Sequence, residues 1–251
     1  MGGPDGTACI AVIPARGGSK RIPRKNIRPM SGQPLLAWTL QTALKSGLFE
    51  HVVVSTDDRE IASIAENCGA EVPFVRPQHL SGDFASIAAV MRHATESGVE
   101  LGWSPDYVCC IYPTAFLVSA SDIAGSRAML SRQSLKPYVT SVVAYPHPIE
   151  RALILSSEGS LVPVNLEAID SRTQDLAPVC HDAGQFCWGT SGAWMASLPV
   201  LSNSLGYLLE PWQVVDIDDE GDWDLAERLH ELQLGRIQDV GAHDQPVPSG
   251  G

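Results

Sequence analysis

Short apolar segments alternate with amphipathic segments along the first 146 residues, and this alternation restricts the fold more than any other feature. Strands are predicted in the apolar segments, at residues 8–14, 51–56, 72–77, 106–113 and 138–146. Helices are predicted between them, at residues 34–47, 57–70, 85–98 and 121–133. Strands that are joined by helices in this way form a mostly parallel sheet that is covered on both faces. The chain is therefore predicted to be an α/β protein with a three-layer, doubly wound sheet.

The length and composition fit one large domain. The chain has 251 residues, of which 44% are hydrophobic and 18% are charged, and the domain is predicted over residues 8–235. Glycine and proline are frequent at both ends, so residues 1–7 and 241–251 are predicted to be disordered tails. No apolar run could span a bilayer, and the N-terminus does not resemble a signal peptide. The six cysteines form no Cys-x-x-Cys pair, which is typical of reduced thiols in the cytoplasm.

The alternation is interrupted between about residues 146 and 200. A predicted hairpin that turns at Glu158 and Gly159 is followed by a long polar segment. A long irregular segment inside a compact domain is usually functional or bound to a partner, so we interpret this part as an insertion with its own role. The alternation resumes with a predicted strand at 212–218 and a closing helix at 218–234.

Positive charge is concentrated in one loop, although the net charge of the chain is −12. Six of the 17 lysines and arginines lie between positions 16 and 28: Arg16, Lys20, Arg21, Arg24, Lys25 and Arg28. The acidic remainder would repel a nucleic acid, so a small polyanion is the expected ligand. A solvated basic loop is the alternative interpretation.

The basic loop directly follows the first predicted strand, at the edge where a doubly wound sheet binds its ligand. Gly17 and Gly18 allow backbone N–H groups to approach an anion. Arg16, Lys20 and Lys25 supply charge for phosphate oxygens. The loop contains neither the Gly-x-x-x-x-Gly-Lys-Ser/Thr pattern nor Gly-x-Gly-x-x-Gly, which disfavours a P-loop ATPase and a dinucleotide oxidoreductase.

Asp216 and Asp218 form a second candidate site near the end of the domain. They are two residues apart in a predicted strand, so both carboxylates face the same side. Two such carboxylates repel one another unless a cation lies between them, and Mg²⁺ binds one or two carboxylates together with phosphate oxygens. Acidic residues at the start of a helix are the alternative interpretation. A polyphosphate-binding loop and a magnesium pair together predict nucleoside triphosphate chemistry.

Several segments of the chain resemble the cytidylyltransferases that activate nonulosonic acids, particularly the members that act on pseudaminic acid. They are IPARGGSKRIPRKN, SGLFEHVVVSTDDREIASIAENCGAEVPFVRPQHLSGD, HDAGQF followed by WG, and VVDIDDEGDWDLAE. The resemblance covers roughly residues 9 to 235. It implies a nucleotide-diphospho-sugar transferase-like fold and transfer of CMP from CTP to the anomeric hydroxyl of an acidic nine-carbon sugar, with release of pyrophosphate. It also implies a requirement for Mg²⁺ and a homodimer that uses the insertion for contact.

The resemblance assigns roles to individual residues. The nucleotide-binding residues would be Arg16, Gly17, Gly18, Ser19, Lys20, Lys25, Asn26 and Arg76, with Lys20 and Arg16 also catalytic. Asp216 and Asp218 match the metal-binding aspartates of the family. In the insertion, we expect Arg172 to bind the carboxylate of the sugar. His181, Asp182 and Gln185 are expected to bind its hydroxyl and acetamido groups.

The segment YPTAFLV, at residues 112–118, departs from the family pattern. Relatives that act on sialic acid carry Gln-Pro-Thr-Ser-Pro-Leu-Arg at this place, so Tyr112 replaces the glutamine and the final arginine is missing. Phe116 stands where the pseudaminic-type pattern usually has a second proline. Sialic, legionaminic and 3-deoxy-manno-octulosonic acid therefore stay alternative acceptors. A nucleotide-sugar-binding glycosyltransferase and an inactive nucleotide-binding regulator are alternatives of other classes.

Overall fold

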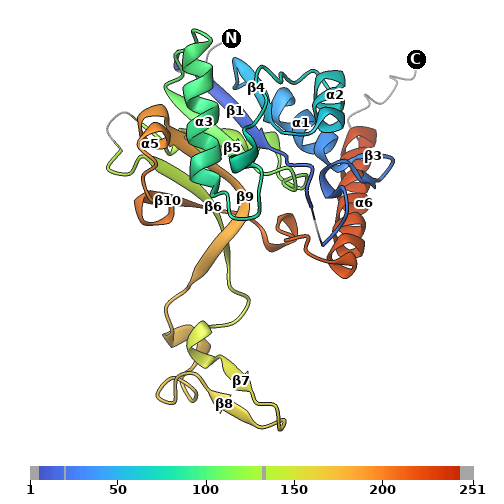
Figure 1. Ribbon diagram of the computed structural model, residues 1–251. Helices are drawn as coiled ribbons and strands as arrows, with labels where there is room; N and C mark the ends of the chain where they lie inside the picture. Colours follow the sequence, from blue (N-terminus) through green and yellow to red (C-terminus); the bar gives the residue numbers. More distant parts are fainter. Residues whose placement is uncertain (1–5, 20, 132–133, 244–251) are drawn as a thin grey trace, which may run out of the picture.

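A six-stranded sheet forms the centre of the molecule, with the strand order β10-β6-β9-β5-β1-β4 (Figure 1). The computed structural model describes residues 6–19, 21–131 and 134–243. The strands of this sheet are β1 (Cys9–Pro14), β4 (His51–Ser55), β5 (Tyr107–Ile111), β6 (Tyr138–Ala144), β9 (Cys180–Thr190) and β10 (Ser204–Leu208). Strand β9 is antiparallel to both of its neighbours, and the other pairings are parallel. The predicted mostly parallel α/β sheet is thus confirmed.

Helices cover both faces of the sheet, as the sequence predicts. They are α1 (Leu35–Lys45), α2 (Arg59–Asn67), α3 (Ile87–Glu100), α4 (Ala120–Ala128), α5 (Ser191–Met195) and α6 (Glu220–His243). Short 3₁₀ turns occur at Lys25–Ile27, Gln78–Leu80, Ile149–Arg151, Thr173–Asp175, Leu201–Asn203 and Pro211–Gln213. A small hairpin, β2 (Pro29–Met30) and β3 (Gln33–Pro34), precedes α1. Within the described residues, no helix is long and apolar enough to cross a bilayer.

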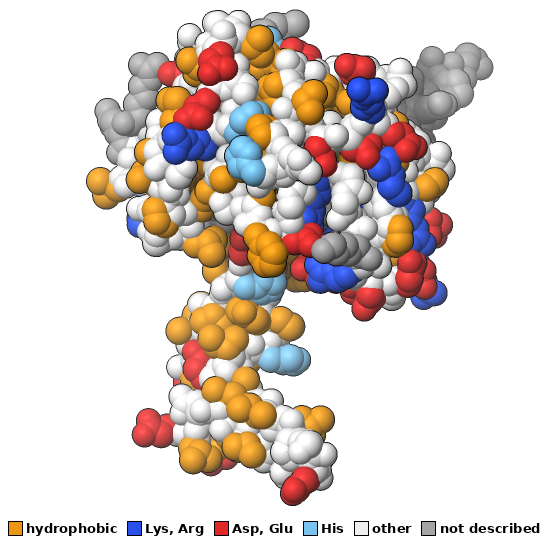
Figure 2. Space-filling model, viewed as in Figure 1, with side chains coloured by type: hydrophobic (Ala, Val, Ile, Leu, Met, Phe, Trp, Pro, Cys, Tyr) orange, Lys and Arg blue, Asp and Glu red, His pale blue; other side chains and the backbone are white. Residues whose placement is uncertain are grey.

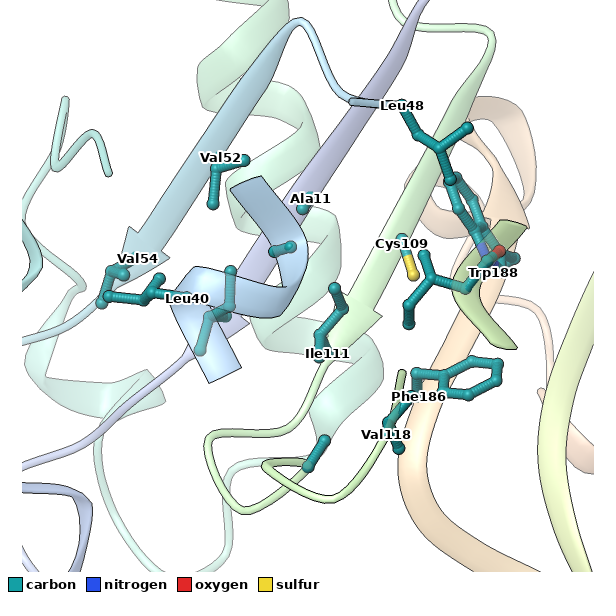
Figure 3. Close-up of a cluster of buried hydrophobic side chains, with 14 of the residues drawn as sticks. Ala11, Leu40, Leu48, Val52, Val54, Cys109, Ile111, Val118, Phe186 and Trp188 are labelled. Carbon is teal, nitrogen blue, oxygen red and sulfur yellow. The ribbon is translucent and has the colours of Figure 1, made fainter. Parts of the chain in front are cut away.

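Alternate side chains of β1 enter two different cores, because successive residues of a strand point to opposite faces. Ala11 and Ile13 belong to a cluster that also holds Leu40 of α1 and Trp188 of β9, and Figure 3 shows part of this cluster around Cys109 and Ile111. Val12 belongs to a second cluster, with Met91 of α3 and Trp194 of α5. Burial on both faces explains why the strands are apolar throughout rather than alternating with polar residues.

Two predicted strands are absent. Within residues 72–77 only Val75 forms a bridge, an isolated one to Thr56 just after β4, since Pro73 and Pro77 carry no N–H group for a ladder. Residues 212–218 begin in a 3₁₀ turn and continue without strand partners. The alternating apolar side chains of this segment are buried although the segment is not a strand. Val215 and Ile217 pack in a third cluster with Trp223 of α6.

Residues 145–179, which we call the arm, leave the sheet between β6 and β9 and project from the body (Figure 1). The arm carries the antiparallel hairpin β7 (Leu153–Leu155) and β8 (Leu161–Pro163). Gly159 has a φ of 80° in the turn between them, as expected for the predicted hairpin. The predicted insertion at about 146–200 is too long, however, because β9 and α5 fall within it and belong to the body. The buried side chains of Phe186 and Trp188 hold β9 in the central sheet.

The predicted tails also differ from the structure at their inner ends. Thr7 is buried, and its hydroxyl accepts a hydrogen bond from Arg127 at 2.7 Å. Helix α6 continues to His243, past the start of the predicted C-terminal tail. The rest of the two predicted tails, residues 1–5 and 244–251, lies outside the described residues, as does Lys20.

We predict that Gly189→Ala destabilises the protein by about 1–3 kcal/mol, the usual cost of overpacking a core. An added Cβ would lie 2.5 Å from the indole nitrogen of Trp194 and 2.6 Å from the ring of Tyr138. Gly192 offers a matched control, because a Cβ there would meet no atom within 4 Å. Urea unfolding should show Gly192→Ala to be at least as stable as wild type, because Gly192 is exposed in α5 and alanine favours a helix over glycine by about 0.5–1 kcal/mol. Equal stability of the two variants would contradict the packing described for β9.

Candidate active site

Two adjoining cavities open at the carboxyl edge of the parallel strands. The first, which we call the loop cavity, has a volume of about 600 Å³ and lies between the basic loop, the segment after Arg76 and the end of β5. The second, which we call the β9 cavity, has about 730 Å³ and lies between the start of β9, the end of β6 and residues 211–218. Arg21, Lys25, Tyr112 and Thr114 line both cavities. The two spaces therefore meet at these four side chains.

The positive charges of the basic loop have different partners. Arg24 donates hydrogen bonds to Asp58 and Glu60 at the start of α2. Arg28 donates to both carboxylate oxygens of Glu220, at the start of α6, over 2.8 Å. Neither arginine lines the loop cavity or the β9 cavity, whereas Arg16 lines the first and Arg21 and Lys25 line both. Part of the basic cluster thus attaches the loop to two helices.

Lys25 connects the loop to the segment that contains the two aspartates. Its ammonium group donates to the carbonyl oxygen of Ile217 at 2.6 Å, and Arg21 pairs with Asp218 at 2.5 Å. Burial lowers the pKa of Lys25, and the nearby carboxylates of Asp218 and Asp216 partly oppose that shift. The positive loop and the two aspartates therefore face one another across the junction of the cavities.

Arg76 is a buried cation in the wall of the loop cavity, with 4% of its surface exposed. Within the described part of the chain, its guanidinium donates hydrogen bonds to two neutral acceptors, the hydroxyl and carbonyl oxygens of Ser55. Burial lowers the pKa of Arg76 to about 10, and the nearby carboxylate of Asp57 only partly opposes this shift. A buried charge with neutral partners is costly unless an anion binds next to it. The wall of the loop cavity is thus suited to a phosphate group.

Three other residues expected at the nucleotide, Arg16, Ser19 and Asn26, line the same cavity, whereas Gly17 and Gly18 do not. Arg16 pairs with Asp83 at 2.7 Å, and both line the cavity. Asn26 is buried and donates to the backbone carbonyl of Arg16 at 3.0 Å, so it fixes the course of the loop. Ser19 also lines the cavity.

The two glycines of the loop have different surroundings. At Gly17 a Cβ would lie 2.5 Å from a carboxylate oxygen of Asp58, so only glycine fits there. At Gly18 a Cβ would meet no atom within 4 Å. The N–H group of Gly17 points to Asp57 at 3.4 Å. Gly17 is therefore needed for close packing of the loop on the start of α2.

The start of β9 places three expected sugar-binding residues, His181, Asp182 and Gln185, around the β9 cavity. Gln185 is 2% exposed, and its side-chain amide nitrogen donates to the carbonyl of Ala183 at 2.9 Å. Its amide oxygen has no hydrogen-bond partner among the residues that the structure describes. Buried acceptors are nearly always satisfied, so this oxygen is suited to an N–H or O–H group of a ligand.

Arg172 does not join these three residues. It is exposed on the arm, at the residue before the 3₁₀ turn Thr173–Asp175, and it lines neither cavity. Arg172 belongs to the arm, which lies outside the sheet, whereas the chain re-enters the sheet only at Cys180, where β9 begins. The expectation that Arg172 shares a site with His181 is thus wrong within one chain.

Asp216 and Asp218 line the β9 cavity beside the loop. Although they are not in a strand, they alternate with the buried side chains of Val215 and Ile217 and are themselves more accessible. The described residues contain no cluster of three or more possible metal ligands. The pair can therefore supply two hard oxygen ligands, and any others would have to come from a substrate or water.

Three residues that line both cavities have no specific role predicted from the sequence: Arg21, Tyr112 and Thr114. The signal that could identify them is their position in the loops that follow β1 and β5, at the edge where ligands bind.

Three comparisons place the chain among known proteins. The cytidylyltransferase family model matches residues 10–154. Pseudaminic acid cytidylyltransferase of Campylobacter jejuni is 38% identical over 224 residues, which are 89% of this chain and 96% of that protein. CMP-N,N'-diacetyllegionaminic acid synthase of Legionella pneumophila is 31% identical over 237 residues, again with 89% and 96% covered. Among solved structures, CMP:2-keto-3-deoxy-manno-octonic acid synthetase complexed with CTP matches with a TM-score of 0.67 and 15% identity, covering 90% of this chain and all of that one, which indicates a shared fold.

We predict that Arg76→Met separates ligand binding from stability. Methionine at this position removes the free-energy cost of burying a charge. The carbonyl oxygen of Ser55 still accepts a hydrogen bond in the variant, from the N–H group of Ala15 at 3.0 Å. The free energy of urea unfolding should therefore equal or exceed that of wild type. The dissociation constant for CTP, measured by calorimetry, should rise about tenfold or more because a charged hydrogen-bond donor is lost. A large loss of stability with unchanged CTP binding would show that Arg76 has only a structural role.

Proposed function

The chain belongs to the cytidylyltransferase family, and we propose that it transfers CMP from CTP to the anomeric hydroxyl of pseudaminic acid. The relatives that cover most of the chain support the general reaction, in which a nucleotidyltransferase moves CMP from CTP to a nonulosonic acid. The choice of pseudaminic acid follows the identity of 38% to the Campylobacter jejuni enzyme, against 31% to the legionaminic acid synthase.

One observation carries the proposal: two substrate-sized cavities meet at Arg21, Lys25, Tyr112 and Thr114. The loop cavity, with its buried guanidinium and basic loop, is suited to the triphosphate. The β9 cavity, with its amide, imidazole and carboxylate groups, is suited to a polar sugar. The junction is then the place where the α-phosphorus of CTP and the hydroxyl of the sugar come together.

The reaction needs positioning and neutralisation of charge more than covalent work by the protein. The sugar hydroxyl releases its proton to water as its oxygen bonds to the α-phosphorus. The bond from that phosphorus to the bridging β-phosphate oxygen breaks, and pyrophosphate leaves with the electron pair of that bond. Arg16 and Arg76 are placed to bind phosphate oxygens in the loop cavity, and Lys25 lies at the junction. Arg16 must exchange Asp83 for the phosphate as CTP enters. Lys20 stays an expected catalytic residue from the sequence.

Mg²⁺ fits the residues at the junction. Asp216 and Asp218 offer the hard carboxylate oxygens that this ion prefers, next to the place proposed for phosphates. When bound, the ion would neutralise charge on the triphosphate and on the leaving pyrophosphate. Arg21 would then release Asp218, with which it is paired in the structure.

The arm supports the proposal of a homodimer. Its hairpin exposes a row of apolar side chains: Leu153, Ile154, Leu155, Leu161, Val162, Val164 and Leu166 are each about half exposed or more. Figure 2 shows hydrophobic side chains gathered on the arm. An isolated two-stranded hairpin is marginally stable in water, and an apolar patch of this kind is typical of an interface. We propose that a second copy covers it; sedimentation should show a dimer, and Leu155→Asp should weaken it.

We also propose that the protein works in the cytoplasm. All six cysteines are free thiols in the structure, including the exposed Cys180. Free thiols persist in a reducing compartment.

The test of the function is a pyrophosphate-release assay with each of the four nucleoside triphosphates and with pseudaminic, legionaminic, sialic and 3-deoxy-manno-octulosonic acids. Release with CTP and pseudaminic acid alone, or at the highest kcat/KM, supports the proposal. A higher kcat/KM with another acceptor would replace pseudaminic acid and leave the reaction class intact. Transfer from a preformed nucleotide sugar without pyrophosphate would instead indicate a glycosyltransferase.

We predict that Asp216→Asn and Asp218→Asn each shift the Mg²⁺ dependence of the rate to higher concentration. Each change removes one charged ligand, so about tenfold more Mg²⁺ should be needed for half-maximal activity. Asp224→Asn is the control, since Asp224 is also acidic but is exposed on α6 and lines neither cavity. Unchanged Mg²⁺ titrations in both variants would rule out these aspartates as the metal ligands.

We predict that Gln185→Ala raises the KM for the acidic sugar about tenfold and changes the KM for CTP by less than about twofold, because Gln185 lines only the β9 cavity. Steady-state kinetics with each substrate varied in turn would measure this. Arg172→Ala is the comparison, since Arg172 lies outside the cavity of its own chain. An increase in the sugar KM of Arg172→Ala would require the arm of a second copy. Equal effects on both substrates would remove Gln185 from the sugar site.

A further inference from the structure

Arg24 has an unusual backbone conformation for its residue type. Its φ of 58° and ψ of 28° lie in the left-handed region, which disfavours residues with a Cβ. The chain turns at this residue from the first half of the basic loop into the 3₁₀ turn Lys25–Ile27. Two side chains of that turn matter for the site: Lys25 lines both cavities, and Asn26 holds the carbonyl of Arg16. The conformation of Arg24 therefore decides where these groups lie.

Two carboxylates hold the guanidinium of Arg24. One nitrogen bonds to a carboxylate oxygen of Asp58. The second lies 3.2 Å from the other oxygen of Asp58 and 2.5 Å from Glu60. Forked contacts of this kind fix both position and orientation, unlike a single contact between flexible side chains.

Asp58 contacts the basic loop at a second point. Its carboxylate lies against the backbone of Gly17, where no Cβ would fit. The same carboxylate accepts hydrogen bonds from the N–H groups of Glu60 and Ile61, at 2.9 and 3.0 Å, and so caps α2. Arg24 holds the pKa of Asp58 below its usual range. One side chain, fixed to a helix, thus touches both halves of the loop.

We propose that Arg24 and Asp58 are positioning residues that shape the basic loop for the triphosphate of CTP, without touching the substrate themselves. Neither lines the loop cavity or the β9 cavity. Asp58 acts through Gly17 on the first half of the loop. Arg24 acts through Lys25 and Asn26 on the second half. The inference rests on the proposed function, because it assumes that the loop cavity binds CTP.

An ordinary surface ion pair is the alternative explanation, and such pairs have little effect. The pair here differs in three ways. Asp58 is only 20% exposed at its side chain, the contact is forked, and it holds a backbone conformation that Arg24 would otherwise avoid. The exposed pair of Arg92 and Glu96 on α3, at 2.7 Å, has none of these properties and serves as a control.

The test uses variants that remove the ion pair with little other change. In Asp58→Asn the side-chain oxygen can still cap α2, but its negative charge is lost. In Arg24→Gln the guanidinium is lost, while the Cβ that disfavours a φ of 58° is kept. Calorimetry with CTP in the absence of sugar, steady-state kinetics and urea unfolding are measured for both variants, for the double variant and for Arg92→Gln.

Each single variant should raise the dissociation constant for CTP about tenfold, and the double variant should show about the same increase, because both changes remove one shared interaction. The KM for the sugar should stay within about twofold of wild type, and Arg92→Gln should bind CTP as wild type does. Wild-type CTP affinity in the folded single variants, or independent effects that multiply in the double variant, would overturn the inference. Failure of the wild-type protein to bind CTP would instead overturn the proposed function and this inference with it. If Asp58→Asn does not fold, Arg24→Gln alone decides the matter by its CTP affinity.

Discussion

Six positive charges between residues 16 and 28 repel one another, and the site depends on how the fold neutralises this repulsion. Arg24 and Arg28 are attached to carboxylates at the first turns of α2 and α6. These carboxylates are themselves stabilised there, because the start of a helix attracts negative charge. The loop is thereby held between two helices. Arg16, Arg21 and Lys25 are left to line the cavities, where a polyanion can compensate them.

The position of β9 connects this loop to the second cavity. Because β9 is antiparallel to β5 and β6, it begins at the edge where those strands end. The start of β9, with Asp182 and Gln185, therefore lies close to Tyr112 and the basic loop, and the arm leaves the body at the same edge. One reversed strand thus places the sugar-binding candidates, the nucleotide-binding candidates and the proposed dimer contact in one region.

Two buried polar groups at the site weaken the fold. Arg76 is a buried cation whose hydrogen bonds go to neutral acceptors, with the carboxylate of Asp57 nearby, and the amide oxygen of Gln185 has no partner among the described residues. Both arrangements are costly without a ligand. Each becomes favourable when an anion or a hydrogen-bond donor occupies the adjoining cavity. Residues of binding sites commonly lower the stability of the unliganded protein in this way. Arg76 and Gln185 therefore mark the two places where substrate is expected.

The sequence by itself determined the α/β sheet, the helices on both faces, the basic loop at the edge of β1 and the family of the chain, because periodicity, turn residues and short motifs are local properties. It did not reveal that β9 lies inside the sheet, since the polar start of that strand conceals a buried second half held by Phe186 and Trp188. Two expectations from the sequence are also wrong: Arg172 does not lie at the sugar site of its own chain, and residues 212–218 do not form a strand. Only the tertiary structure decided these points and divided the basic residues between helix anchors and cavity walls. The physical reason is that partners far apart in the chain, such as Arg28 and Glu220 or Lys25 and Ile217, meet only when the whole fold forms.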